Sequence, residues 1–184
     1  MANEDVPEHE AEQLQEVSYD FTIRPLMRQS DIKLRHSPAS VAELIALKKV
    51  LRTLHGLEIM AVNIYRFQIS KENSELNEKL ISAMCNEMTH VQDFQVKLYE
   101  YGLSPSKVRW AWWMVGFIFG FLSRLLGKRM ILKTGIWVES KAVKHYGELL
   151  TAVKWDEDTR KIIEKDKSDK QQHIEQWKFL LETA

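Results

Sequence analysis

Charged and imidazole side chains interrupt the apolar stretches of this sequence at four places, and their types suit a metal centre. Glu58, Glu87 with His90, Glu139 and His173 each fall in or beside a run of apolar residues. Glu87 and His90 are three positions apart, so on a helix they project from one face. A buried carboxylate is unfavourable unless it is paired, and a metal ion can neutralise several carboxylates at once.

Iron is the metal that this combination favours. Two irons in a four-helix bundle are held by one glutamate from each of two helices and a Glu-x-x-His motif from each of the other two. Carboxylates bridge the irons and neutralise their charge, and imidazoles complete the coordination. A single Glu-x-x-His motif is weak evidence, and each glutamate taken alone is explained as simply by a solvated helix face or a salt bridge. The order of one acid on each of three apolar stripes is what favours a metal site.

The fourth part of the pattern is altered. The residue three positions before His173 is Lys170, where a glutamate is expected. An ammonium beside a metal site repels the cation. Asp169, four positions before His173, lies on roughly the same helix face. Either Asp169 replaces the missing ligand, or the bundle no longer assembles two irons.

Four long helices are predicted to position these residues. Only four prolines and seven glycines interrupt the sequence, and apolar residues recur with a helical period. The first helix is expected to begin at Ser37-Pro38, where a cap residue precedes a proline, and the second near Asn73-Ser74. The sequence therefore predicts an all-α protein, an up-and-down ferritin-like four-helix bundle with an inserted amphipathic helical hairpin at the membrane interface. The expected bundle helices span about 37–69, 74–102, 130–153 and 157–181.

The segment from Val108 to Leu132, between the second and third of these helices, is unusually aromatic. Its uncharged core, residues 110–123, is 14 residues long, which is shorter than the roughly 20 residues that cross a bilayer as a helix. Tryptophans at one end and cations at the other indicate a helix that lies at a membrane interface. The alternatives are a buried core helix and an oligomer contact. The residues expected at the interface are Trp110, Trp112, Trp113, Phe117 and Phe121.

Charge is unevenly distributed along the chain. Residues 1–20 hold seven acids and no lysine or arginine, and the other 164 residues carry 26 basic against 19 acidic groups. We expect residues 1–36 to form a polar, mobile tail and residues 37–184 the bundle, with the membrane-interface insert at about 108–129. The mild positive charge of the bundle suits an anionic membrane surface better than nucleic acid, because no dense basic patch with interleaved aromatics occurs. A single cysteine, Cys85, rules out an internal disulfide and fits a reducing compartment.

At these positions the sequence resembles the demethoxyubiquinone hydroxylases of ubiquinone biosynthesis, which are membrane-associated members of the ferritin-like superfamily. The resemblance covers about residues 40–180, and its most distinctive parts are the last two of four stretches. These stretches are GLEIMAVNIYRFQ (Gly56 to Gln68), EMTH (Glu87 to His90), LLGKR (Leu125 to Arg129) and VESKAVKHY (Val138 to Tyr146).

The resemblance implies a non-haem di-iron monooxygenase that activates O₂ and hydroxylates the ring of a polyprenylated quinone precursor. The aromatic insert falls where the family has a hydrophobic hairpin that faces the membrane and admits a lipid-tailed substrate. No catalytic residue is expected beyond the ligands of the two irons. The expected ligands are Glu58, Glu87, His90, Glu139 and His173, with Asp169 as a substitute for the last glutamate, whose position Lys170 occupies.

Three further side chains are expected close to the ligands. Tyr65 and Tyr146 either hydrogen-bond the ligands or relay electrons, or they are core tyrosines whose hydroxyls need only a partner. His145 is either an outer partner of a ligand or a partly exposed helix histidine.

Three functions are compatible with these features. The first is a membrane hydroxylase that receives electrons from an external donor, because no nucleotide-binding glycine motif occurs. The second is a metal-poor bundle that binds a quinone or another long-chain lipid, or serves as an accessory subunit of a larger complex, and Lys170 favours it. The third is iron storage or peroxide scavenging, which the aromatic insert disfavours.

The expected partners are a lipid surface, a quinone or other long-chain lipid, an electron donor and, through the exposed aromatic segment, a second copy of the chain. We expect a peripheral membrane protein on the cytoplasmic face of a bacterial membrane or the inner face of an organellar membrane.

Overall fold

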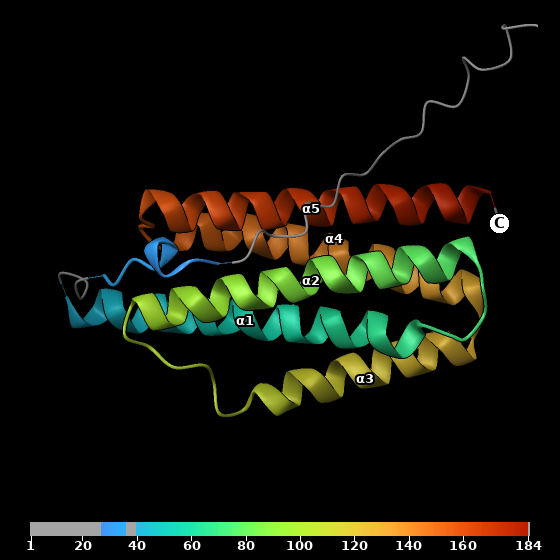
Figure 1. The fold of residues 1–184 in the computed structure, drawn as a ribbon, viewed down its shortest axis with the longest axis horizontal. Helices are drawn as coiled ribbons and strands as arrows, with labels where there is room; N and C mark the ends of the chain where they lie inside the picture. The colour runs from blue at the N-terminus through green and yellow to red at the C-terminus, as the bar shows by residue number, and fades with distance from the viewer. Residues whose placement is uncertain (1–26, 36–39, 184) are drawn as a thin grey trace, which may run out of the picture.

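In the part of the chain that the structure describes, five α-helices run side by side along the long axis of the molecule (Figure 1). The computed structural model describes residues 27–35 and 40–183, and no strand occurs among them. The prediction of an all-α protein is therefore confirmed. The helices are η2 (Gln29–Asp31, a single 3₁₀ turn), α1 (Val41–Gln68), α2 (Glu75–Glu100), α3 (Arg109–Leu125), α4 (Lys128–Ala152) and α5 (Glu157–Glu182).

The bundle consists of α1, α2, α4 and α5, and α3 lies outside it against α1 (Figure 1). The insert between α2 and α4 is a single helix within the described residues, and its hairpin partner is α4 itself. Because α3 carries the chain back along the length of the molecule, α2 and α4 run in the same direction (Figure 1). The expectation of an up-and-down order was wrong in this respect, and the observed order is the single-crossover arrangement of ferritin-like bundles.

Side-chain caps fix where the helices begin. Ser40 accepts a hydrogen bond from the backbone N–H of Glu43, whose carboxylate accepts one from the backbone N–H of Ser40. Ser74 caps α2, as the sequence predicts, and Asp156 caps α5. The start predicted at Ser37-Pro38 lies outside the described residues.

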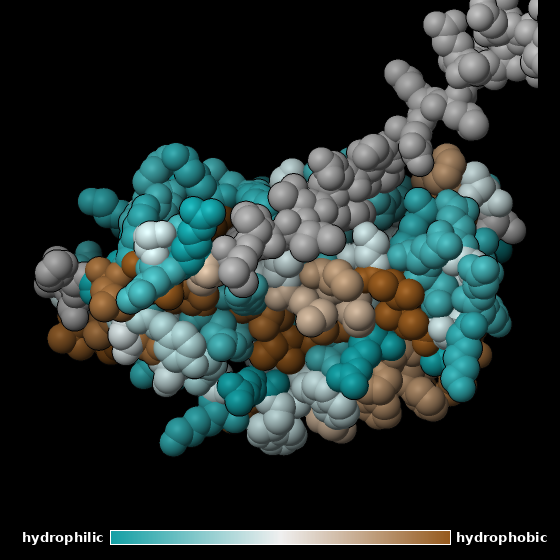
Figure 2. All heavy atoms as spheres, viewed as in Figure 1, coloured by the Kyte–Doolittle hydropathy of each residue, from teal (hydrophilic) through white to brown (hydrophobic). Residues whose placement is uncertain are grey.

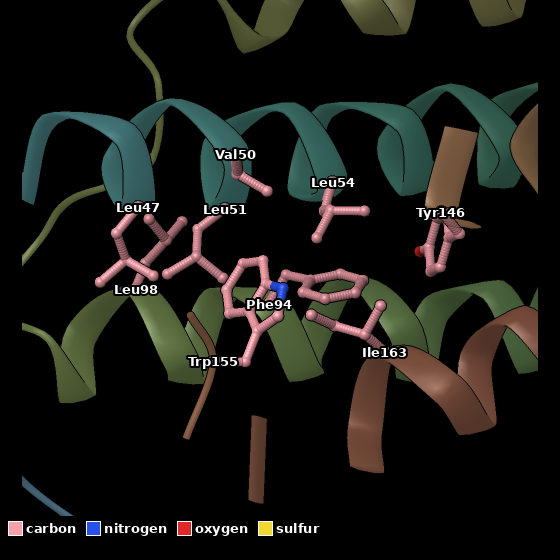
Figure 3. Packing of buried hydrophobic residues seen from close by; sticks show 9 residues of the cluster. All are labelled: Leu47, Val50, Leu51, Leu54, Phe94, Leu98, Tyr146, Trp155 and Ile163. Atoms are coloured by element: carbon pink, nitrogen blue, oxygen red, sulfur yellow. The ribbon is translucent and has the colours of Figure 1, made fainter. Parts of the chain in front are cut away.

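The core of the bundle consists of two apolar clusters, one toward each end. The first, seen in Figure 3, joins side chains from all four bundle helices and the loop before α5. The buried members of the first cluster are Leu47, Val50, Leu51, Leu54, Phe94, Leu98, Tyr146, Trp155 and Ile163. Those of the second are Tyr65, Leu80, Ala83, Ile131, Leu132, Trp177 and Leu180. Between the two clusters each bundle helix contributes buried charged or imidazole side chains, and this layer holds the predicted site.

The end of the segment predicted as a tail contacts the bundle. Arg35 forms ion pairs with Glu100 at 3.2 Å and with Asp156 at 2.6 Å. The backbone N–H of Lys33 also donates to Glu100 at 2.9 Å. Residues 27–35 therefore tie the C-terminal end of α2 to the start of α5.

Helix α3 exposes much of its aromatic surface. Of the five residues predicted at a membrane interface, Trp110, Trp113 and Phe121 are exposed, and Trp112 and Phe117 are half-buried. Figure 2 shows tan and brown residues gathered at the lower right, in the region of α3. Within the described residues, none of the helices has the length and apolar character needed to cross a membrane.

Two glycines let α3 lie close to α1. A Cβ atom on Gly116 would be 2.5 Å from the backbone oxygen of Met60, and one on Gly120 would be 2.5 Å from that of Ile64. Backbone atoms cannot move aside as a flexible side chain can. The spacing of four residues places both glycines on the same face of α3, so this face is fixed against α1.

We expect Gly120→Ala to lower the free energy of unfolding by about 1–3 kcal/mol, because the added methyl group overpacks the α1–α3 contact. Gly147→Ala in α4 is the matched control, since its Cβ would meet only the Lys167 ammonium, at 3.6 Å. The control should be neutral or stabilising by up to about 1 kcal/mol, the helix-propensity gain of alanine. Urea denaturation measures both, and equal effects in the two variants would show that α3 tolerates the methyl group.

Candidate metal centre

All four bundle helices contribute to a polar layer between the apolar clusters. Glu58 comes from α1, Glu87 and His90 from α2, Glu139 from α4, and His173 from α5. Each of these side chains is at most 1% exposed. The five ligands predicted from the sequence therefore lie in one buried layer.

Lys170 lies at the centre of this layer. Its ammonium is 2.8 Å from Glu58 Oε2, 2.7 Å from Glu87 Oε2 and 3.7 Å from Glu139 Oε2. Burial alone would lower the pKa of Lys170, but the three carboxylates raise it well above its usual value. The lysine is therefore charged at neutral pH, and its ammonium lies among the carboxylates predicted to bind metal.

Burial raises the pKa of the carboxylates and the Lys170 ammonium lowers it, and the net shift differs between Glu58 and Glu87. Burial raises the pKa of Glu58 to about 7, although Lys170 opposes the shift. Burial also favours the protonated form of Glu87, but Lys170 and His90 hold the pKa of Glu87 well below its usual range. Glu87 is thus a firmly ionised carboxylate at neutral pH.

Two tyrosines hold two of the carboxylates. The Tyr146 hydroxyl donates to Glu58 Oε1, and the Tyr65 hydroxyl donates to Glu139 Oε1. Trp177 donates from its indole N–H to the Tyr65 hydroxyl at 3.1 Å. Burial, together with the neighbouring carboxylates, raises the pKa of both tyrosines well above the usual value, so both remain donors. Such outer hydrogen bonds fix the orientation of metal-binding carboxylates.

His90 has acidic groups on both sides of its ring. Its Nδ1 is 3.3 Å from Glu87 Oε2, and its Nε2 is 3.0 Å from Asp169 Oδ2 and 3.5 Å from Asp166 Oδ1. Burial would lower the pKa of His90, but these acids raise it well above its usual value. Asp169, predicted as a substitute ligand, is therefore placed on the outer nitrogen of His90 and also pairs with Lys165 at 2.9 Å.

His173 lies on the other side of the layer. Its Nδ1 is 3.2 Å from Glu87 Oε1 and 3.6 Å from Glu139 Oε1. Burial would lower the pKa of His173, but the hydrogen bonds with Glu139 and Glu87 raise it. Three groups in this region offer ligand atoms that all lie within 4.8 Å of one another. They are Glu58 with Glu87 and His90, Glu87 with Glu139 and His173, and His90 with Asp166 and Asp169.

The carboxylate and imidazole ligands suit iron, but the two sides of the layer differ in whether a carboxylate oxygen is free to bind a metal. Both oxygens of Glu58 are hydrogen-bonded, one by Tyr146 and one by Lys170. Glu139 Oε2, in contrast, is buried and accepts no hydrogen bond from the described residues. The Glu139 side therefore offers a carboxylate oxygen for a metal, whereas Lys170 fills the Glu58 side.

A cavity of about 460 Å³ leads from this layer toward α3. Glu58, Glu139 and Lys170 are its buried polar lining residues, Lys141, Lys144 and Glu148 are exposed charged ones, and most of the remaining wall is apolar. His145 also lines it; this histidine is partly exposed and lies 3.5 Å from Glu148. The apolar and aromatic wall residues come from α1, α3 and α4: Leu57, Met60, Ala61, Ile64, Val115, Phe119, Trp137, Val138 and Ala142.

Sequence reasoning missed the role of Trp177 as a partner of Tyr65. A signal existed, because Lys170 and Trp177 are seven residues apart, as are Glu58 and Tyr65. Two helical turns connect the polar layer to the second apolar cluster on both helices. The cavity could not be foreseen, because its wall combines residues from four helices.

The fold and this layer define a class: a ferritin-like helical bundle with a buried carboxylate–histidine centre. The family described as ubiquinone biosynthesis protein COQ7 matches residues 45–177. The chain belongs to this family, and the resemblance seen in its motifs is confirmed.

Two groups of relatives have hydroxylase names. The chain is 26% identical over 133 residues to the mitochondrial NADPH-dependent 3-demethoxyubiquinone 3-hydroxylase of Dictyostelium discoideum, covering 70% of this chain and 61% of the relative. It is 26% identical over 165 residues to the 3-demethoxyubiquinol 3-hydroxylase of Legionella pneumophila strain Corby, covering 84% of this chain and 78% of the relative.

We expect Lys170→Met to lower the free energy of unfolding by about 3–5 kcal/mol, because removal of one partner leaves buried carboxylates uncompensated. Lys161→Met, on the same helix, is the control. Lys161 pairs with Glu157 at 3.1 Å, but both side chains are about 70% exposed, so a loss of less than about 1 kcal/mol is expected. Urea denaturation in the presence of a chelator compares the two, and similar losses would contradict the central role of Lys170.

Proposed function

We propose that this protein is a membrane-associated, iron-dependent hydroxylase that acts on the ring of a polyprenylated quinone precursor. The observation that carries the proposal is the cavity, which joins the buried carboxylate–histidine layer to the exposed aromatic helix α3. The family and the hydroxylase names of the relatives support the reaction class.

The size and lining of the cavity suit a quinone ring with an apolar tail. Its volume of about 460 Å³ lies within the range of small-molecule sites, which are mostly apolar with a few polar groups that orient the ligand. Here Glu58, Glu139 and Lys170 supply the buried polar groups, and Val115 and Phe119 line the cavity from α3. A substrate with a long apolar tail can therefore place its ring at Glu58 and Glu139 while the tail leaves beside α3.

The side chains of this layer have distinct tasks in such a reaction. Iron, when bound by the carboxylates and His173, supplies the reductive activation of O₂. Tyr65 and Tyr146 hold Glu139 and Glu58 in place through their hydroxyls. The apolar wall of the cavity excludes water from the reacting ring and fixes its orientation.

The electrons for this reaction come from an external donor. One relative is named as NADPH-dependent, and the sequence carries no nucleotide-binding glycine motif. The relatives come from a mitochondrion and from a bacterium, which supports an organellar or a bacterial membrane as the site of action.

A second candidate is favoured by Lys170 alone. The ammonium neutralises part of the carboxylate charge without any metal, so the bundle can keep its buried layer as a metal-free, quinone-binding accessory protein. The two candidates share the cavity and the membrane surface. They differ in whether a hydroxylated product forms.

Filling the cavity tests the proposed substrate site. Val115→Phe should weaken binding of a short-chain demethoxyubiquinone at least tenfold, measured by calorimetry in detergent, and lower product formation with ferrous iron and a chemical reductant. Ile118→Phe is the matched control, because Ile118 is exposed on α3 and does not line the cavity. Binding without any product in the wild type would favour the accessory role. Equal binding by both variants would overturn the substrate site.

Membrane association depends on the exposed face of α3 in this proposal. Phe121→Glu should reduce co-sedimentation with anionic phospholipid vesicles by about tenfold, since it places a charge where an aromatic side chain enters the interface. Phe179→Glu on α5 makes the same change at a residue that is 59% exposed, against 44% for Phe121. If the α5 variant loses binding as much as the α3 variant, α3 is not the membrane-binding surface.

A further inference from the structure

The buried layer is not symmetric about Lys170, and this asymmetry bears on how many metal ions the chain holds. The ammonium is within 2.8 Å of oxygens of Glu58 and Glu87 but 3.7 Å from the nearest oxygen of Glu139. It hydrogen-bonds the first two carboxylates and only approaches the third. The positive charge therefore lies on the α1–α2 side of the layer.

We infer that this chain holds one divalent transition-metal ion, at Glu87, Glu139 and His173, and that the Lys170 ammonium takes the place of a second. The inference rests on the proposed function, since it specifies the metal content of the same site.

Charge balance supports one ion. The three carboxylates of the layer carry three negative charges when ionised, and Lys170 supplies one positive charge. The remaining charge of minus two matches one divalent cation. Two divalent cations would leave two uncompensated positive charges in a buried site, which is strongly unfavourable.

The charged groups around His90 form a separate set in which acidic and basic groups are paired with one another. Asp166 and Asp169 face the Nε2 of His90, and Lys165 pairs with Asp169 at 2.9 Å. The Nδ1 of His90 faces Glu58 and Glu87 at 3.5 and 3.3 Å. Both ring nitrogens therefore point at carboxylate oxygens, as in a histidine that donates twice, and the ring is engaged in ion pairs on the side that Lys170 fills.

The opposite side has the features of a metal-binding group. Glu87, Glu139 and His173 offer ligand atoms within 4.8 Å of one another, and all three side chains are buried. Glu139 Oε2 accepts no hydrogen bond from the described residues. Tyr65 holds the other oxygen of Glu139, as outer partners of metal ligands do. Three protein ligands leave coordination positions open for other molecules, as in catalytic metal sites in general.

The number of ions per chain tests the inference directly. The full chain, purified in detergent, is loaded anaerobically with ferrous ion, or with Co²⁺ as a spectroscopic probe, and the bound metal is counted by elemental analysis. We expect about one ion per chain in the wild type. Lys170→Glu should bind close to two, whereas Lys178→Glu, an exposed lysine on the same helix, should remain at one.

A matched pair of carboxamide variants tests the position of the ion. Glu139→Gln should weaken Co²⁺ binding at least ~100-fold and abolish its absorption bands, because even outer partners of a ligand are worth 10- to 100-fold in affinity. Glu58→Gln should keep one ion, with affinity lowered by the lost negative charge but by at least ~10-fold less than in Glu139→Gln, because Glu58 is not a ligand of the ion. Circular dichroism and thermal melting confirm that each variant is folded.

Each of the other possible results of these experiments would contradict a specific part of the inference. Two ions per chain in the wild type would overturn the inference and leave the hydroxylase proposal standing. No ion in a folded wild-type chain would overturn both. One ion that is lost in Glu58→Gln and kept in Glu139→Gln would overturn its assignment to the Glu139 side.

Discussion

The structure depends on one buried ion-pair cluster, the Lys170 ammonium among the carboxylates of Glu58, Glu87 and Glu139. These residues come from all four bundle helices, and the cluster separates the two apolar parts of the core. A buried charge must be matched in position as well as in sign, so the four helices cannot slide along one another independently. Tyr65 and Tyr146 extend the cluster into the apolar regions on either side. The helix bundle and the site are thus stabilised by the same contacts.

Much of the fold and of the site could be predicted from the sequence. Helical periodicity and the cap at Ser74 located the helices within a few residues, and Glu87 with His90 pointed to one face of one helix. The position of Lys170 could not be derived, because a substitution shows a change of charge but not where a flexible side chain of four methylenes ends. The placement of Asp169 was beyond sequence reasoning for a similar reason. Positions 169 and 170 are neighbours, and small differences in helix rotation decide which one points inward.

Helix α3 links two properties that the sequence presents as separate. One face has the close glycine contacts with α1, and another exposes tryptophan and phenylalanine. Between them, Val115 and Phe119 contribute to the wall of the cavity. One helix of 17 residues therefore has three roles. It exposes an aromatic surface, it packs closely against the bundle, and it lines one side of the cavity. Under the proposed function, an apolar ligand passes along this helix from a bilayer to the buried layer without crossing open water.

The covalent attachment of the Lys170 ammonium has a consequence for how the fold responds to its surroundings. A dissociable ion stabilises a folded protein only to the extent that its free concentration exceeds its dissociation constant, so the stability of a metal-bound bundle follows metal supply. A cation carried by the chain itself is present at fixed stoichiometry and cannot be lost to a chelator or to competing proteins. Part of the carboxylate charge in this core is consequently neutralised from the moment of folding, and a cell depleted of metal would still accumulate the folded bundle.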